Sequence, residues 1–267
     1  MTAPLETRVA TWDMRSLADR LLRAKYKVSQ TIGEGGQSAA TFGLDAPAIT
    51  VTFTPAEGEP ITIEVGSPVG ARESYVRRSG SDLVATVEVR PDTLLKARAL
   101  DYRDASIWNL DPEKITRFEV VEHSAGGQGD VTFAFRREGG GWEMESPVSA
   151  KATGKVAEAV AAVARLRTQK WVDDQADKLS LYGLHAPMLT VRITATAASE
   201  ETAETHVLRV SSRSPIGEDT KVYVRAGDEP FVGLLMKTVT DKLRPSMAEW
   251  RDMTVVSEPV QTATAVT

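Results

Sequence analysis

The sequence contains no cysteine, which excludes disulfide bonds, thiol catalysis and zinc sites built from thiolates. Histidine is scarce as well: His123, His185 and His206 are far apart and fall on different expected elements. No spacing such as His-Glu-x-x-His links them, so ordinary surface roles are favoured over metal binding. We therefore expect no metal site and no cofactor.

Long apolar runs and an excess of positive charge are also absent. The most apolar stretch, residues 156–166, is interrupted by Glu158 and Arg165 and falls short of the roughly 18 residues of a membrane span. The first residues lack the basic start and apolar stretch of a signal peptide. The net charge is −5, from 32 basic and 37 acidic residues that are interspersed. We predict no direct membrane insertion and no nucleic-acid binding.

Complete catalytic and nucleotide-binding motifs are missing too. Residues 31–38 resemble the glycine-rich loop of a protein kinase, but the lysine strand, His-Arg-Asp and Asp-Phe-Gly segments do not follow. A Walker loop would require Gly-Lys-Ser or Gly-Lys-Thr. No Gly-x-Ser-x-Gly elbow occurs, and the paired acids Asp173 and Asp174 match no calcium loop. We expect a chain that binds no nucleotide and is not an enzyme; a hydrolase that joins acids from distant segments is the remaining catalytic alternative.

What the sequence does contain is an internal repeat. The segment Phe-Gly-Leu-Asp-Ala-Pro-Ala-Ile-Thr-Val at residues 42–51 returns as Tyr-Gly-Leu-His-Ala-Pro-Met-Leu-Thr-Val at residues 182–191. Shorter matches follow in the same order, namely 67–70 with 214–217 and 75–77 with 223–225. An ordered series of matches separated by loops of different length indicates a duplicated unit.

Each copy of this motif has a mechanical interpretation. The shared positions are an aromatic residue, a glycine, a leucine and a proline: Phe42, Gly43, Leu44 and Pro47, then Tyr182, Gly183, Leu184 and Pro187. The glycine supplies a turn, the leucine a core side chain, and the proline sends the chain into a strand. We interpret the eight residues as a structural motif and predict a positive φ angle at one or both glycines.

The apolar periodicity predicts an α+β fold of two tandem related modules, each a mostly antiparallel sheet with flanking helices. Strands are expected at 49–54, 61–65, 74–78, 83–89, 115–121, 131–135, 142–144, 189–194, 206–210, 221–225 and 230–232. Helices are expected after the cap residues Asp13 and Thr153, and at 92–100 and 233–243. We predict modules at 1–112 and 113–256 and a disordered tail at 257–267.

The two modules differ in how they begin. A hairpin of two expected strands, joined through the glycines at 126–129, precedes the helix of the second module. Nothing comparable precedes the helix of the first module. We therefore expect the first module to be N-terminally incomplete and the chain to be a fragment of a longer protein with an additional apolar span.

These features resemble a bacterial family catalogued as domain of unknown function 4340. The aromatic-Gly-Leu-x-x-Pro segment before a strand is the most specific likeness, and Arg103-Asp104, residues 109–112, Trp142 and Pro147 also fit that pattern, over roughly residues 13–256. The resemblance implies an extracytoplasmic module on the periplasmic side, held by a membrane anchor in the full-length protein. For some members it implies a link to exporters of the ATP-binding-cassette (ABC) type and to gliding motility. It supplies no catalytic residues.

We accordingly expect a non-enzymatic extracytoplasmic scaffold or accessory module of a membrane-associated complex, with a protein partner at the membrane. An ABC-type exporter or the gliding machinery is the expected setting. The alternative is a glycan- or peptide-binding module that uses the cleft between the repeats. Exposed aromatic side chains would favour that alternative, but most of the five tryptophans fall at junctions between expected elements and are expected in the core.

Overall fold

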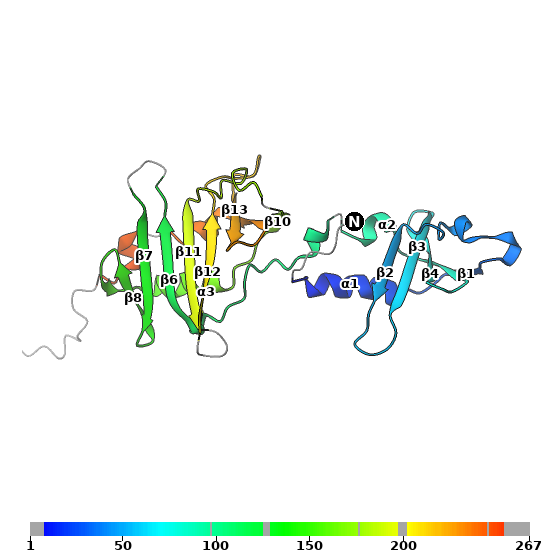
Figure 1. The fold of residues 1–267 in the computed structure, drawn as a ribbon, viewed down its shortest axis with the longest axis horizontal. Helices are drawn as coiled ribbons and strands as arrows, with labels where there is room; N and C mark the ends of the chain where they lie inside the picture. The colour runs from blue at the N-terminus through cyan, green and yellow to red at the C-terminus, as the bar shows by residue number, and fades with distance from the viewer. Residues whose placement is uncertain are drawn as a thin grey trace, which may run out of the picture. The chain divides into compact units, whose positions relative to one another are not determined.

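The computed structural model describes residues 8–96, 98–124, 129–175, 177–196, 202–244 and 246–253. The chain divides into two compact units, Met1–Asp104 and Ala105–Thr267, and each is described here by itself (Figure 1). This division falls upstream of the boundary between residues 112 and 113 expected from the sequence. The glycines at 126–127 and the tail at 257–267 lie outside the described residues.

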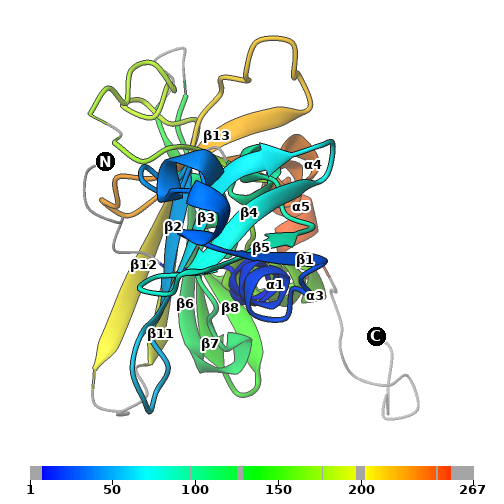
Figure 2. The same ribbon diagram turned by 90° about the vertical axis from the view of Figure 1, so that its right-hand side faces the viewer.

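Unit 1 contains a five-stranded antiparallel sheet in the order β1-β5-β4-β3-β2 (Figure 2). Its strands are β1 (Val28–Thr31), β2 (Ile49–Phe53), β3 (Ile61–Val69), β4 (Glu73–Arg78) and β5 (Leu83–Val87). The helices of unit 1 are α1 (Thr11–Leu22), the 3₁₀ helices η1 (Glu34–Gly36) and η2 (Ala39–Phe42), α2 (Pro91–Leu94) and the 3₁₀ helix η3 (Ala99–Tyr102).

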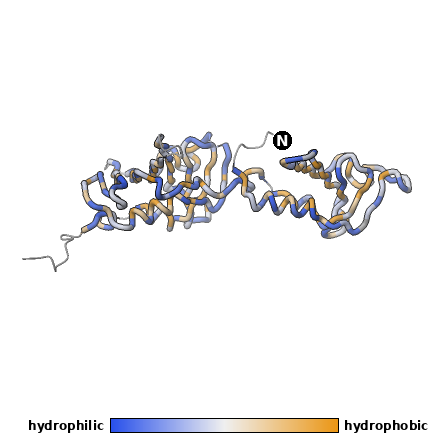
Figure 3. Tube along the Cα trace, turned by 90° about the horizontal axis from the view of Figure 1, so that it is seen from below, coloured by the Kyte–Doolittle hydropathy of each residue, from blue (hydrophilic) through white to orange (hydrophobic). Residues whose placement is uncertain are grey.

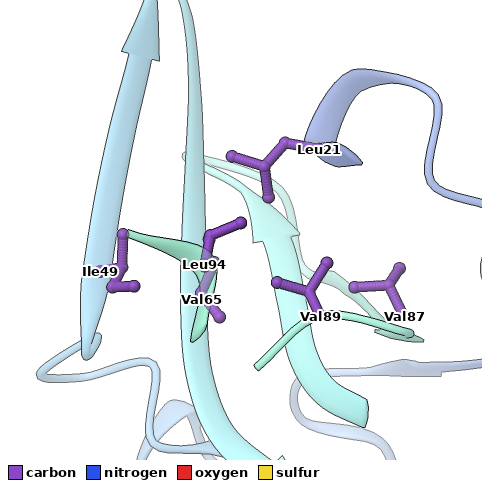
Figure 4. Packing of buried hydrophobic residues seen from close by; sticks show 6 residues of the cluster. All are labelled: Leu21, Ile49, Val65, Val87, Val89 and Leu94. Atoms are coloured by element: carbon purple, nitrogen blue, oxygen red, sulfur yellow. The ribbon is translucent and has the colours of Figure 1, made fainter. Parts of the chain in front are cut away.

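The core of unit 1 forms where α1 and α2 pack on one face of the sheet. Because side chains alternate between the faces of a strand, every second residue of β2, β3 and β5 points to this face. Figure 3 shows the resulting alternation of hydrophobic (orange) and hydrophilic (blue) residues along the chain. Figure 4 shows the buried side chains that meet there, namely Leu21, Ile49, Val65, Val87, Val89 and Leu94.

Unit 2 contains a nine-stranded sheet in the order β10-β14-β13-β12-β11-β6-β7-β8-β9. Its strands are β6 (Ile115–Glu122), β7 (Val131–Glu138), β8 (Gly141–Ser146), β9 (Ala150–Lys151), β10 (Lys170–Asp173), β11 (Leu189–Thr196), β12 (Ala203–Val210), β13 (Lys221–Ala226) and β14 (Val232–Met236). Its helices are the 3₁₀ helix η4 (Pro112–Lys114), α3 (Gly154–Ala164), α4 (Lys237–Asp241) and α5 (Met247–Trp250). No helix in the described part of the chain combines the length and the apolar composition needed to cross a bilayer.

Five strands of unit 2 repeat the arrangement of unit 1. The order β10-β14-β13-β12-β11 corresponds strand for strand to β1-β5-β4-β3-β2, and α3 precedes its strands as α1 does. The predicted α+β fold of two related modules is therefore confirmed, as is the common strand order of residues 40–105 and 180–245. The strands β6 to β9 extend the sheet of unit 2 beyond β11.

Several expected elements were wrong in detail. The helix expected at 92–100 is two short helices, α2 and η3, because the backbone at Leu95 adopts an extended conformation (φ −104°, ψ 147°). The helix expected at 233–243 begins only at Lys237, since Gly233 lies in β14 and pairs with Trp171 of β10. Asp13 lies inside α1, whose N-cap position is Ala10. Thr153 does occupy the N-cap position of α3, but its hydroxyl donates to the carbonyl of Glu249.

Candidate functional site

The shared motif packs in the same way in both units. The ring of Phe42 meets that of Tyr75 nearly edge-on with centroids 5.0 Å apart, and Tyr182 meets Tyr223 in the same manner at 5.0 Å. The motif leucines Leu44 and Leu184 are buried beside these pairs, and the motif prolines Pro47 and Pro187 stand just before β2 and β11. The motif thus fastens the chain to one end of each sheet.

The motif glycines adopt backbone angles that other residues rarely take. Gly43 has φ +66° and Gly183 has φ +67°, so the predicted positive φ is confirmed. Space is limited as well: a Cβ atom on Gly43 would collide with the Ser67 hydroxyl and lie 2.9 Å from its backbone nitrogen. At Gly183 it would lie 2.6 Å from the hydroxyl of Ser211.

The second aromatic motif residue carries a hydroxyl that the first lacks. Tyr182 donates this hydroxyl to the carboxylate of Asp173 at 2.7 Å. Burial, together with the hydrogen bond to Asp173, raises the pKa of Tyr182 to about 12. Phe42 has no titratable group, so the two copies of the motif respond differently to pH.

His123 joins two side chains from other elements. Its Nδ1 lies 2.7 Å from Asp130 Oδ2, and its Nε2 lies 2.9 Å from Thr190 Oγ1. A hydroxyl, an imidazole and a carboxylate in series match the order of a nucleophile, a base and its orienting acid. Thr190 is only 5% exposed, however, because it lies within β11 between β6 and β12. The series ties His123 and nearby Asp130 to β11, and sequence reasoning missed it because Thr190 is 67 residues away from His123.

The other histidines and the glycine-rich loop show no common site. His185 is exposed, whereas the ring of His206 lies 5.6 Å from Trp108. In the kinase-like loop, the Gly33 amide donates to the carbonyl of Gln37 at 2.7 Å, so the loop closes on itself. The described residues contain no group of three or more histidine, aspartate and glutamate side chains arranged to hold a metal.

The tryptophans are mostly core residues, as expected. Trp108, Trp142, Trp171 and Trp250 are buried in unit 2, whereas Trp12 of unit 1 is 77% exposed.

Strand β2 of unit 1 forms an open sheet edge, and this edge is the candidate functional site. Among the described residues, β2 pairs with β3 on one side and with no strand on the other. Its counterpart β11 pairs with β12 on one side and with β6 on the other, antiparallel in both cases. The outer backbone groups of β2 therefore correspond to groups that hydrogen-bond to β6 in unit 2.

The sequence of β2 lacks the features that usually protect a sheet edge. Such edges are commonly short, charged, bulged or interrupted by proline. In unit 2, the edge strand β9 has two residues, and the edge strand β10 carries Lys170 and Asp173 with a register shift between Trp171 and Asp173. Strand β2 reads Ile-Thr-Val-Thr-Phe, with no charge and no proline. The edge strand β1 of unit 1 is also uncharged. Its counterpart β10 is an edge strand too, so unit 2 gives no example of a strand that covers this position.

The apolar side chains near β2 are only partly covered. Val51, Phe53 and Ile63 are half-buried and belong to the margin of the unit 1 core. Their counterparts by register, Val191, Ile193 and Leu208, are 0% exposed. Cross-strand contact with β6 accounts for much of this difference, because Val191 lies opposite Val120 and Ile193 lies opposite Phe118.

The segments that follow the two sheets also correspond. The Ala10 amide donates to the Tyr102 carbonyl at 2.8 Å, and the Thr153 amide donates to the Trp250 carbonyl at 2.9 Å. Tyr102-Arg103-Asp104 thus matches Trp250-Arg251-Asp252, a repeat that the sequence comparison had missed although both copies read aromatic-Arg-Asp.

These two aromatic residues have different surroundings. Trp250 is fully buried against the rings of β6 and β7, with centroid distances of 6.2, 6.4 and 5.1 Å to Phe118, Phe133 and Phe135. Tyr102 is half-buried, and its hydroxyl accepts from the Lys96 amide at 2.8 Å. The aromatic position of unit 1 therefore lacks the cover that β6 and β7 give in unit 2.

Two residues near the start of α1 are exposed at positions whose counterparts in unit 2 lie beside Trp142 of β8. Aligning Ala10 with Thr153 places Val9 at Ala152 and Met14 at Ala157. The amide of Ala152 donates to the Trp142 carbonyl of β8 at 3.0 Å, and Ala157 borders the same depression as Trp142. Val9 and Met14 are 42% and 37% exposed. We call the open edge of β2 together with the half-buried Val51, Phe53 and Ile63 the β2 surface.

Comparison with known proteins places this chain in a family. The profile of the family described as domain of unknown function (DUF4340) matches residues 1–178 and 142–267. The chain belongs to that family, and the two overlapping matches indicate tandem copies of the family's domain. No curated protein and no solved structure matches the chain.

Proposed function

We propose that this protein is a non-enzymatic scaffold or accessory module of a membrane-associated complex, and that it acts outside the cytoplasmic membrane by binding another protein. The observation that carries the proposal is the β2 surface. It combines an uncharged open strand edge with half-buried apolar side chains, and the duplicate of this surface within the same chain is covered by protein. Exposed apolar groups beside an unpaired strand are typical of protein interaction sites.

The chemistry of the described residues supports binding better than catalysis. His123, which has a partner at each ring nitrogen, contacts a buried threonine. The motif residues are used in packing. Membership in the DUF4340 family supports the extracytoplasmic setting through the likeness described above, with transporter subunits of the ABC type as the first partners to test.

A photo-cross-linking residue tests this function in the native membrane. We would place it at Thr50, which is exposed on β2, and as a control at exposed Ser29 on β1, in the full-length protein expressed in its own host. We expect Thr50 to capture proteins of a membrane complex, transporter subunits first, and Ser29 to capture far less. Fractionation of the protein with the cytosol, or turnover of an ester, glycoside or phosphate substrate by the purified chain, would contradict the proposal.

A further inference from the structure

We infer that the β2 surface binds an antiparallel β-hairpin of a separate partner polypeptide, which adds strands to the sheet of unit 1 as β6 and β7 do in unit 2. This inference rests on the proposed function, because it states how the partner is held. Adding a strand to an open edge satisfies the outer amide and carbonyl groups of that edge, so the main chain provides much of the affinity.

The register of β11 with β6 shows how such a hairpin would lie. Leu189 stands opposite Glu122, Val191 opposite Val120 and Ile193 opposite Phe118. Transferred to unit 1 through the shared motif, these pairs place an apolar partner residue opposite Val51 and another opposite Phe53. The partner strand therefore carries large apolar residues at alternate positions on the face that joins the core.

The other face of β2 defines the polar part of the partner. At this face, Arg192 of β11 makes an ion pair with Glu119 of β6. The corresponding residue of β2 is Thr52, whose hydroxyl lies 3.0 Å from that of Thr62. A neutral or β-branched residue opposite Thr52 therefore fits unit 1, where a carboxylate fits unit 2.

A hairpin accounts for the β2 surface better than a second copy of this chain. Pairing of two β2 edges would place one strand beside β2 but none to correspond to β7, which pairs with β6 in unit 2. In unit 2 both strands contribute cover, because Trp250 meets Phe118 of β6 and Phe133 and Phe135 of β7. The chain's own β6 and β7 are already paired with β11 and β8. The fitting occupant is thus a hairpin with aromatic residues from another polypeptide.

The test uses the intact chain and a defined probe, a fluorescein-labelled peptide with the sequence of residues 113–138. We would measure its affinity by anisotropy and its position by hydrogen exchange of the β2 amides. We expect protection of residues 49–53 on addition of the peptide. An absence of protection at millimolar peptide would overturn the inference.

A charge substitution checks the register. Thr52→Arg recreates the partner of Glu119 and should tighten binding about two- to fivefold, whereas Thr52→Glu should weaken it by a similar factor. Both signs should reverse with a Glu119→Lys peptide. Thr52 is exposed, so neither change threatens the fold. The matched controls are Ser29→Arg and Ser29→Glu on the exposed edge of β1; equal effects there would show long-range attraction only and would overturn the register.

Two further outcomes would also overturn the inference. Protection of β2 that increases with protein concentration without peptide, together with a dimer in sedimentation, would make a second copy the occupant. Cross-links from Thr50 to another part of the same full-length polypeptide would make the occupant internal. If membrane-complex proteins were captured only from other surfaces, the proposed function would stand and this inference would fall.

Discussion

Units 1 and 2 share a five-strand sheet but differ in what lies beside the last strand of the repeat. In unit 2, β11 pairs with β6 on its outer side, and the β11 residues Val191 and Ile193 are fully buried. In unit 1, β2 ends the sheet, and Val51 and Phe53 are half-buried. The shared five strands thus form in either setting, whereas complete burial of their apolar face requires neighbouring strands. The comparison separates what the repeat needs to fold from what it leaves available for contact.

The largest expected effect contrasts the two aromatic residues that follow the sheets. Trp250→Ala should destabilise unit 2 by about 3–5 kcal/mol, because removal of the indole leaves a cavity lined by three phenylalanines. Tyr102→Ala should destabilise unit 1 by only about 1 kcal/mol, since the ring is partly exposed already. Hydrogen exchange followed by mass spectrometry can report each unit separately. Equal losses of unfolding free energy in the two variants would mean that Tyr102 is packed as well as Trp250.

Next in size is the effect of a side chain at the motif glycine. Gly43→Val should destabilise unit 1 by about 1–3 kcal/mol, because it adds a clash with Ser67 to an unfavourable φ. The matched control is Gly70→Val, at φ +59° with no atom within 4 Å of an added Cβ. Urea unfolding followed by circular dichroism would measure both. A cost at Gly43 no larger than at Gly70 would show that the close approach to Ser67 is unimportant.

A smaller effect distinguishes the two copies at high pH. The folded-state pKa of Tyr182 is raised from 10.0 to about 12, so the proton is held more tightly in the folded state. The related stability is complete below about pH 10 and is lost as the pH rises through about 12. Tyr182→Phe should remove this dependence from unit 2, whereas unit 1 already has Phe42 there. Tryptophan fluorescence during urea unfolding would report mainly unit 2, which contains four of the five tryptophans.

The smallest effect concerns acid. The hydrogen bond from Lys155, supported by Ser246, lowers the pKa of Glu249 from 4.5 to about 2. The related stability is present above about pH 4.5 and is lost as the pH falls through about 2. Glu249→Gln should flatten the dependence of unit 2 on pH in this window, with unit 1 as the internal reference. Because the pair is exposed, the change should also shrink in high salt. An unchanged acid profile would contradict the assigned cause.

Much of the fold was predictable from the sequence because it depends on local patterns. Alternating apolar residues located most strands, and the aromatic-Gly-Leu-x-x-Pro motif located the repeat and its turn. The strands β1 and β10 were not expected, since four residues each give too short a pattern. The single helix expected at 92–100 failed because Leu95 leaves helical geometry, which apolar spacing does not reveal.

The candidate site was far less predictable. An open edge is a property of strand order, and strand order depends on contacts between distant segments. The sequence did carry one relevant signal, the expected hairpin before the second helix that has no counterpart before the first. It could not show that β6 pairs with β11, nor that the matching position of unit 1 is β2. The contact of His123 with Thr190, 67 residues away, was hidden for the same reason.

The ion pairs at the starts of α1 and α3 have opposite polarity, and this bears on how the chain avoids misassembly. Asp13 of α1 pairs with Lys96 at 2.6 Å, whereas Lys155 of α3 pairs with Glu249 at 2.6 Å. Two copies of one fold in a single polypeptide are prone to exchange equivalent segments during folding. In the alignment of Tyr102 with Trp250, however, Lys96 matches Arg244 and Glu249 matches Asp101, so an exchange of the segments that follow the sheets would keep opposite charges together at both helices. The discrimination between a unit's own segment and its duplicate therefore falls to the aromatic residue, because Trp250 is buried against phenylalanines of β6 and β7 whereas Tyr102 is half-buried.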